Sequence, residues 1–470
     1  MKMFLAGKWV DRDRKIQVRN PFDGSVIDDV PRADGDDVDK AVESALAGFE
    51  QMKKLTRRKR ASILEKTACL IEKKQEELGI TIAKESGKTI REGKGEAGRA
   101  IETFTLSAYE ARRLAGEIIP FDAAPGAENK FGFYLRCPIG VVGAISPFNF
   151  PLNLVAHKIA PAIAAGNAVV LKPASATPLV ALKLTEILLE AGLPSLAINV
   201  ICGPGGEVGE ELAAHDRLRL ITFTGSLEVG KRITAVAGIK RVTLELGSNS
   251  ALIVMGDADL KRASTRAAVC AFALAGQVCI SVQRIFVEER VFEEFTSLLV
   301  EETSRMCTGN QLLETTDIGP MINTKAAEDT QVLVDEAVER GAKLLVGGNR
   351  NGSLYQPTVL TSVPDDTRLF MEEAFAPLVL VNPVSSLDEA IRETNKSVYG
   401  LQAGIFTQDI SAAMRSAHEI DAGGVMINEA PTFRADLQPY GGMKQSGLGR
   451  EGPKFAMEEM TELKAVAFHL

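Results

Sequence analysis

The fold is decided by three short apolar stretches: IGVVGAI (139–145), AVVL (168–171) and AINVI (197–201). Each is rich in β-branched residues, which is typical of a strand buried on both faces of a sheet. Residues 178–191 between the last two have helical spacing and end at Gly192 and Pro194. The run LRLITF (218–223) repeats the strand pattern. This alternation predicts βαβ units in a parallel sheet, where ligands bind at the carboxyl ends of the strands.

The same alternation returns further along the chain. Strand-like and helical segments follow one another at 251–255, 260–275, 284–287 and 291–306. The first hundred residues look helical and charged, with helical spacing over 36–51 and 57–84. Residues 424–449 are rich in glycine and turn formers, as binding loops often are. We therefore expect two α/β domains with a cleft between them.

Composition excludes several classes of protein. The chain has 470 residues, 45% of them hydrophobic, with a net charge of −8, so it can build a core and has no basic excess for nucleic acid. The N-terminus does not resemble a signal peptide, and the longest apolar run, near 159–171, is too short to cross a membrane. Six cysteines without CxxC spacing and four histidines give no zinc signature. We expect a cytoplasmic enzyme with reduced thiols and no metal.

Three residues in loops are candidates for chemistry. Cys279 in GQVCI (276–280) is a candidate thiolate nucleophile, or else a small buried hydrophobe. Glu245 in LELGSN (244–249) is a candidate general base with a raised pKa, or else an ordinary strand-end carboxylate. Asn149 in SPFNFP (146–151) lies between two prolines, where a rigid amide can stabilise an oxyanion or simply complete a turn.

Two further segments are candidates for binding phosphate. FTGS (223–226) ends a strand and opens a helix, so Ser226 is a good N-cap beside free backbone N–H groups. Lys172 follows another strand and could reach a ribose or phosphate, or be an ordinary solvated lysine. The glycine-rich GPGG (203–206) is not a GxGxxG fingerprint and is weak support alone.

Seven motifs occur in one order along the chain: FNFP, LKPA, FTGS, LELG, GQVC, EEAFAP and PYGGMKQSGLGRE. Together they resemble the aldehyde dehydrogenase superfamily over essentially the whole chain. The stretches NLVAHKIAPA (153–162) and AGQVCIS (275–281) are most similar to the short lactaldehyde dehydrogenase-like members. The resemblance implies that Cys279 is the nucleophile and that the other five cysteines are packing residues.

By the same resemblance, Asn149 and the backbone N–H of Cys279 form the oxyanion hole, and Glu245 activates the water that hydrolyses a thioester. A branch of the superfamily that transfers the acyl group to coenzyme A lacks this glutamate, so Glu245 favours hydrolysis to the free acid. A protein that keeps the fold without turnover is the other alternative, although both the nucleophile and the base are present here.

The resemblance also implies a nicotinamide cofactor. The residues expected to bind it are Ser146, Phe148, Lys172, Ser175, Gly205, Phe223, Gly225, Ser226, Leu246, Glu373 and Phe375. Members restricted to NAD often carry a glutamate where this chain has Ser175. That carboxylate would repel a 2′-phosphate, so its absence admits NADP as well as NAD.

The substrate is expected to be a short polar aldehyde of the lactaldehyde or glycolaldehyde type. The residues predicted to face it are Arg99, His157, Val278, Ile280 and Arg434. Alternatively, the two arginines are surface residues and the histidine only packs. If the arginines hold an anion, the aldehyde would be sulfolactaldehyde, phosphonoacetaldehyde, succinate semialdehyde or glyceraldehyde 3-phosphate, although Val278 argues against the last.

The expected fold is α/β and aldehyde dehydrogenase-like, with two open twisted sheets and a small β oligomerisation element. The cofactor domain would span 1–117 and 139–247, and the catalytic domain 248–447. Residues 118–138 and the tail 448–470 would form the third part. Residues 132–135 and 464–468 alternate like edge strands, so we expect them to pair across subunits of a homodimer or homotetramer.

Overall fold

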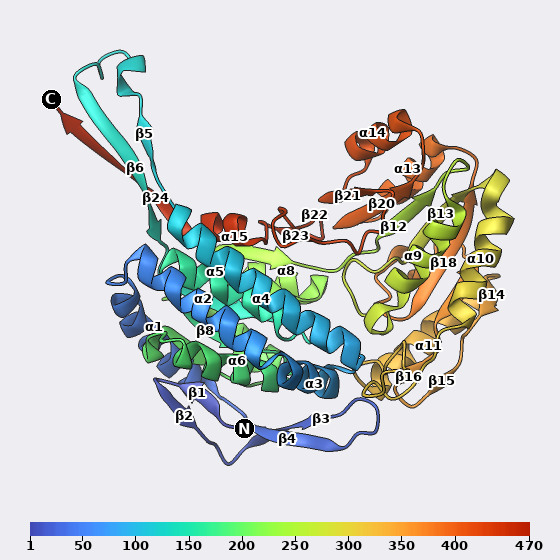
Figure 1. The fold of residues 1–470 in the computed structure, drawn as a ribbon, viewed down its shortest axis with the longest axis horizontal. Helices are drawn as coiled ribbons and strands as arrows, with labels where there is room; N and C mark the ends of the chain where they lie inside the picture. The colour runs from blue at the N-terminus through green and yellow to red at the C-terminus, as the bar shows by residue number, and fades with distance from the viewer.

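The computed structural model describes residues 1–470 as two α/β units and a projecting arm (Figure 1). Each unit has its own open sheet and its own hydrophobic core. The arm is a separate, small β-sheet. This confirms the predicted fold class, while the residue boundaries given for the domains stay a prediction.

The first sheet carries the predicted parallel strands. In spatial order its strands are β2 (Lys8–Val10), β1 (Met3–Leu5), β9 (Ile198–Val200), β8 (Ala168–Lys172), β7 (Val141–Ile145), β10 (Leu220–Thr224), β11 (Arg241–Glu245) and β23 (Gly447–Leu448). The five central strands, β9, β8, β7, β10 and β11, are parallel to one another. The pairings of β2, β1 and β23 are antiparallel. From β7 the chain adds β8 and β9 on one side, then β10 and β11 on the other. The boundary between β7 and β10 is therefore a topological switch point, where such sheets bind ligands.

Helices surround this sheet. They are α1 (Gly35–Met52), α2 (Arg57–Lys73), α3 (Gln75–Ser86), α4 (Ile90–Arg113), α5 (Asn153–Ala165), α6 (Leu179–Glu190), α7 (Glu210–Ala214), α8 (Leu227–Ala237) and α15 (Pro453–Glu459). Every residue of α5 is buried, because this apolar helix packs on β7 and β8 and is covered by α2 and α4. α5 directly follows the loop that contains Asn149.

The expectation that the first hundred residues are helical is wrong for the N-terminal 31. That segment forms β1, β2 and a hairpin of β3 (Lys15–Arg19) and β4 (Val26–Pro31). β2, β3 and β4 keep exposed or half-buried residues, so they show none of the apolar runs that mark a central strand. The predicted helical segment 57–84 is also divided at Lys74, where α2 ends and α3 begins.

The second sheet lies in the other unit. Its order is β14 (Lys343–Val346), β17 (Thr358–Thr361), β18 (Leu378–Val384), β13 (Arg284–Glu288), β12 (Ala251–Val254), β20 (Gln402–Phe406) and β21 (Gly424–Ile427). All of its pairs are parallel except β14 with β17. Its helices are α9 (Leu260–Phe272), α10 (Phe292–Ser304), α11 (Thr324–Glu339), α12 (Arg368–Met371), α13 (Leu387–Asn395) and α14 (Ile410–Glu419). Two short pairs, β15 (Arg350–Asn351) with β16 (Leu354–Tyr355) and β19 (Tyr399–Gly400) with β22 (Met443–Lys444), complete it.

The arm is a three-stranded sheet with β6 (Lys130–Pro138) between β24 (Thr461–His469) and β5 (Glu117–Ile119). It projects from the body and carries the C-terminus (Figure 1). Residues 132–135 lie in the central strand, paired with β24 and β5 of the same chain, so the expectation of pairing across subunits is wrong for them; for 464–468, which keep one free edge, it stays a prediction. The open edges that remain belong to β24 and β5. Across the whole structure, none of the helices is both long and apolar enough to cross a membrane.

Candidate active site

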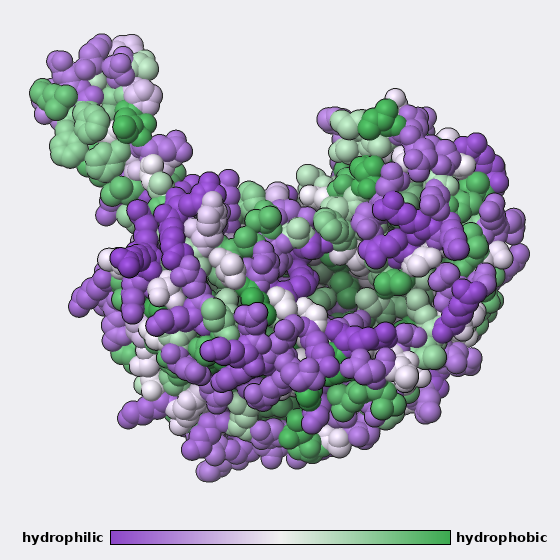
Figure 2. Space-filling view, viewed as in Figure 1, coloured by the Kyte–Doolittle hydropathy of each residue, from purple (hydrophilic) through white to green (hydrophobic).

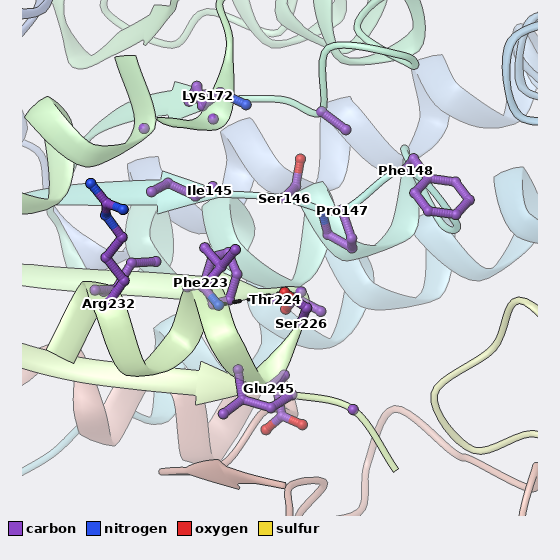
Figure 3. A pocket seen from close by; sticks show the side chains of 18 of the residues that line it. Ile145, Ser146, Pro147, Phe148, Lys172, Phe223, Thr224, Ser226, Arg232 and Glu245 are labelled. Carbon is purple, nitrogen blue, oxygen red and sulfur yellow. Dashed lines mark hydrogen bonds between the residues drawn. The ribbon is translucent and has the colours of Figure 1, made fainter. Parts of the chain in front are cut away.

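A cavity of about 640 Å³ opens at the switch point of the first sheet. Its wall includes all eleven residues predicted to bind the cofactor, together with Asn149, Glu245 and Cys279. Figure 3 shows the strand ends that line it, with Ser146 and Phe148 after β7, Ser226 after β10 and Glu245 at the end of β11. The five residues predicted to face the substrate do not line this cavity.

Cys279 lies on a tightly held loop that follows α9. The predicted helix 260–275 stops at Phe272, and Leu274 and Ala275 then adopt left-handed φ values of 49° and 51°. Gly276 has a φ of +70°, and a Cβ there would lie 1.9 Å from the carbonyl oxygen of Ala376, so only glycine fits. Such strained backbone persists only where its surroundings hold it, and here it sets the nucleophile loop.

Hydrogen bonds with both units hold the loop of Cys279. The backbone N–H of Leu274 donates to Glu92 Oε1 of α4 at 2.7 Å, and Gln277 Nε2 donates to the carbonyl of Leu274 at 3.0 Å. Gln277 Oε1 accepts in turn from the N–H of Ile322 at 3.0 Å. The cysteine is therefore fixed from both units.

Asn149 faces the same loop. Its Nδ2 donates to the carbonyl of Gln277 at 3.0 Å, while its Oδ1 is buried and has no partner. One of the two amide N–H bonds is thereby used to orient the side chain, and the second remains as a donor. Asn149 thus lies close to the nucleophile loop, where a donor can stabilise negative charge on a carbonyl oxygen.

Glu245 is nine-tenths buried at the end of β11, and its Oε2 has no hydrogen-bond partner. Burial raises its pKa well above the ordinary value, and the nearby carboxylate of Glu451 raises it further. The loop of the PYGG motif passes directly over it, and a Cβ on Gly441 would lie 2.9 Å from Glu245 Oε1. A carboxyl group with a raised pKa is a stronger base in its ionised form than an exposed glutamate.

Lys172, Ser175, Glu373 and Phe375 also line the cavity. Lys172 is buried, which lowers its pKa to about 8, and Ser175 donates to the carbonyl of Gly203 at 2.8 Å. Glu373 is half-buried and accepts from the N–H of Ser248 at 2.9 Å, and desolvation raises its pKa to about 7. Phe375 packs edge-on against Phe148 with ring centroids 5.9 Å apart.

The predicted substrate residues gather on the other side of Cys279. The thiol lies 3.1 Å from the hydroxyl of Tyr440, and the guanidinium of Arg434 lies 3.8 Å from the centre of that ring. Arg434 Nη2 lies 3.1 Å from His157 Nε2 and pairs with Glu451 at 3.0 Å. Val278 and Ile280 pack with Tyr440 in a small apolar cluster.

The carboxylate of Asp436 contacts two members of this cluster. Asp436 Oδ1 accepts from Arg99 Nη2 at 2.9 Å and lies 3.1 Å from His157 Nε2. Lys158 of α5 pairs with Glu451 at 3.2 Å and donates to Thr224 at 2.6 Å. The bond with His157 and the charges of Arg99 and Arg434 lower the pKa of Asp436, and Lys158 and Arg434 lower that of Glu451 to about 2. Arg99, Lys158 and Arg434 thus pair with Asp436 and Glu451, and the carboxyl group of Glu245 also lies near Lys158 and Arg434.

Sequence reasoning missed five residues of this region. They are Lys158, Arg232, Asp436, Tyr440 and Glu451. Tyr440 and Glu451 stand within the quoted PYGGMKQSGLGRE motif, so their positions were visible and their contacts were not. Arg232 lines the cavity from α8 beside Ile145 and Phe223 (Figure 3), and pairs with Glu210. The prediction that the other cysteines pack is wrong for Cys69 and Cys307, which are exposed.

Comparison with known proteins agrees with this geometry. The model of the Aldehyde dehydrogenase family matches residues 9–466. The chain is 46% identical to the 3-sulfolactaldehyde dehydrogenase of Priestia aryabhattai, over 100% of this chain and 98% of the relative. It is 44% identical to the lactaldehyde dehydrogenase of Methanococcus maripaludis, over 99% and 100%.

A solved structure of a similar protein has the same fold. The glyceraldehyde-3-phosphate dehydrogenase GapN of Methanocaldococcus jannaschii, in complex with NADP, superposes with a TM-score of 0.94 at 40% identity. The match covers 98% of this chain and 100% of that one. The resemblance inferred from the seven motifs is confirmed, and the chain belongs to the aldehyde dehydrogenase family.

Proposed function

We propose that this protein oxidises a short polar aldehyde to its carboxylic acid with NAD or NADP as the hydride acceptor. The observation that carries the proposal is the position of Cys279. It lies between a cavity lined by Asn149 and Glu245 and a buried polar cluster that contains Arg434. The wall of one cavity thus holds a candidate nucleophile, Cys279, an amide donor, Asn149, and a carboxylate base, Glu245. The cofactor would bind on one side of Cys279 and the rest of the aldehyde on the other.

In the first half-reaction the Cys279 thiolate attacks the aldehyde carbon, forming a C–S bond and an oxyanion. Asn149 Nδ2 and the backbone N–H of Cys279 donate to that oxyanion; such a donor typically contributes about 100–1,000-fold in rate. Phe375 and Glu373 would hold a nicotinamide ring, which would accept the hydride. Loss of hydride from the carbon leaves a thioester on Cys279.

In the second half-reaction Glu245 takes a proton from a water molecule that attacks the thioester. The C–S bond then breaks, the carboxylic acid leaves and the thiolate of Cys279 is restored. Glu245 must be ionised to do this, and its raised pKa makes the ionised form a stronger base.

The cavity fits a dinucleotide. Its wall holds Ser146, whose buried hydroxyl has no partner, and Lys172, which is buried beside Ser175. The N-terminus of α8 also opens onto it, where Ser226 caps the helix and free backbone N–H groups favour a pyrophosphate. No carboxylate replaces Ser175, so the 2′-phosphate of NADP meets no repulsion at that position.

The polar cluster favours an aldehyde that also carries an acidic group. The guanidinium of Arg434 can donate to an anionic substituent, and it lies close enough to the reacting centre to lower the pKa of Cys279. A relative of 46% identity is named for 3-sulfolactaldehyde, which combines a 2-hydroxyaldehyde with a sulfonate. We therefore place an anionic 2-hydroxyaldehyde beside lactaldehyde and glycolaldehyde as a candidate substrate.

A matched substrate panel tests this assignment. With NAD and with NADP, kcat/KM is measured for 3-sulfolactaldehyde, lactaldehyde, glycolaldehyde, propanal and hexanal. Hydroxylated or anionic aldehydes should exceed propanal by more than about 100-fold, because a site with buried polar groups rejects substrates that leave them unpaired. A preference for hexanal would refute the polar site and leave only aldehyde oxidation.

The Arg434→Ala variant separates the anionic from the neutral candidates. A charge-assisted hydrogen bond is worth about 1.5–3 kcal/mol, so the ratio of kcat/KM for sulfolactaldehyde to that for lactaldehyde should fall about 10- to 100-fold. Damage to the fold would reduce both values and leave their ratio unchanged. Adding coenzyme A to the wild-type enzyme is the companion control, because a strict requirement for it would replace hydrolysis by acyl transfer.

A further inference from the structure

Tyr440 is placed against the nucleophile by contacts on three sides. Its hydroxyl has one hydrogen-bond partner, Cys279 Sγ, at 3.1 Å. Its backbone forms an isolated antiparallel bridge with Glu451, with N–H to carbonyl distances of 3.1 and 2.6 Å. The side chain is 3% exposed and packs among Val278, Ile280 and other apolar residues. The ring is therefore fixed, and its one polar atom is aimed at the sulfur.

We propose that Tyr440 is a catalytic residue that donates a hydrogen bond to the thiolate of Cys279. This rests on the proposed role of Cys279 as the nucleophile. A thiolate has no proton to give, so in the reactive state the O–H must be the donor. Because Tyr440 is buried, little water competes for its hydroxyl, which strengthens such a bond.

The charges around the pair agree with this direction of donation. Burial raises the pKa of Cys279 to about 12, and the carboxyl groups of Glu373 and Glu245 act in the same direction. The hydrogen bond with Tyr440 and the charge of Arg434 are the influences that lower it. The pKa of Tyr440 is itself raised well above its ordinary value by burial, so the phenol keeps its proton. Arg434 above the ring draws electron density from the phenol and makes it a better donor.

Alkylation of Cys279 tests the proposal without any aldehyde. The rate at which iodoacetamide alkylates the sulfur, with loss of iodide, follows the thiolate population and is measured against pH until it stops rising. Cys69 and Cys307 are exposed and will also react, so Cys279 must be followed by mass spectrometry. Cys270 lies in the same tryptic peptide, 267–284, and fragment ions separate the two sites.

Tyr440→Phe removes only the hydroxyl. We expect its profile to move to higher pH by about one unit, with alkylation at neutral pH about tenfold slower. Tyr109→Phe is the matched control, because Tyr109 is 55% exposed on α4 and should leave the profile unchanged. The proposal fails if the alkylation rate of Tyr440→Phe has the same pH profile as that of the wild type. It also fails if that rate is reduced by the same factor at every pH, including the plateau, because Tyr440 then only packs. Because no aldehyde is used, this outcome is independent of whether the protein oxidises aldehydes.

Discussion

At the scale of single residues, we predict that Glu245 sets the pH dependence of turnover. Its pKa is raised by burial and by the neighbouring carboxylate of Glu451, so at low pH it holds a proton and cannot accept one from water. The ionised fraction grows as the pH rises through that pKa. We predict that kcat, where hydrolysis limits it, increases with pH beyond the range in which an exposed glutamate is already ionised.

Replacing Glu451 tests whether its charge raises the pKa of Glu245. Glu451→Gln removes a negative charge beside Glu245 and leaves the charges of Lys158 and Arg434 nearby, so the pKa of Glu245 should fall. The rise in kcat should then move to lower pH, as measured in steady-state assays over a pH series. A profile that stays in place or moves upward contradicts this account of Glu245.

Cys279→Ala is the second prediction at this scale. The variant lacks the sulfur that forms the covalent intermediate, so turnover should fall by more than about 1,000-fold. Cofactor affinity, followed by the fluorescence of reduced nucleotide, should stay close to the wild-type value, because most of the cavity wall is unchanged. Retention of even a tenth of the activity would assign the nucleophile to another residue.

At the scale of secondary-structure elements, α4 supports both catalytic loops. Glu96 accepts from the backbone N–H groups of Leu152 and Asn153 at 2.8 and 3.0 Å, where α5 begins after Asn149. One turn earlier, Glu92 accepts from Leu274 ahead of the nucleophile. The buried ammonium of Lys88 also pairs with Glu96. A single helix therefore holds both the segment after Asn149 and the loop that leads to Cys279.

Glu96→Ala should break this support. It removes a helix cap and leaves the ammonium of Lys88 without its partner, and losing one member of a buried pair costs about 3–5 kcal/mol. We expect that loss in the free energy of unfolding measured with urea, together with a lower kcat. Glu102→Ala, at an exposed position of the same helix, should change stability by less than about 0.5 kcal/mol. Equal stability of the two variants would mean that Glu96 does not hold α5.

The elements also show what sequence could and could not predict. Strands β7, β8 and β10 were located to within two residues, because buried apolar runs bounded by glycine or proline are unambiguous. The residues of the cavity wall were predictable mainly through the resemblance of the motifs, and only some of them, such as Ser146 and Ser226, also follow those strand ends. The contact of Arg99 with Asp436 joins positions 337 apart, and no local pattern encodes it. From the sequence, Arg99 and Arg434 are expected to be available to bind an anion. In the structure each of them already forms an ion pair with a carboxylate of the chain.

At the scale of the whole molecule, the arm indicates assembly. Ile118 is 70% exposed, Phe131 45% and Phe468 49%. Figure 2 shows apolar surface on the arm, below its hydrophilic end. Its outer strands, β5 and β24, present unpaired edges that soluble proteins normally cover. We propose that a second copy of the chain covers them in a homodimer or homotetramer.

Sedimentation should therefore give two or four times the chain mass of 50.5 kDa. Ile118→Asp places a charge on the apolar surface and should shift the distribution to smaller species at the same concentration. Wild-type protein that sediments as a monomer at micromolar concentration would show that the arm has another role.

The central claim is that one aldehyde is oxidised in two chemical steps, with Cys279 carrying the acyl group and Glu245 releasing it. Stopped-flow measurement of reduced nucleotide in Glu245→Gln, with the best substrate of the panel, tests both steps at once. We predict a rapid burst close to one equivalent per active site, followed by a steady rate far below wild type, because the thioester accumulates. A steady rate equal to that of the wild-type enzyme at neutral pH, with no burst, would contradict the account.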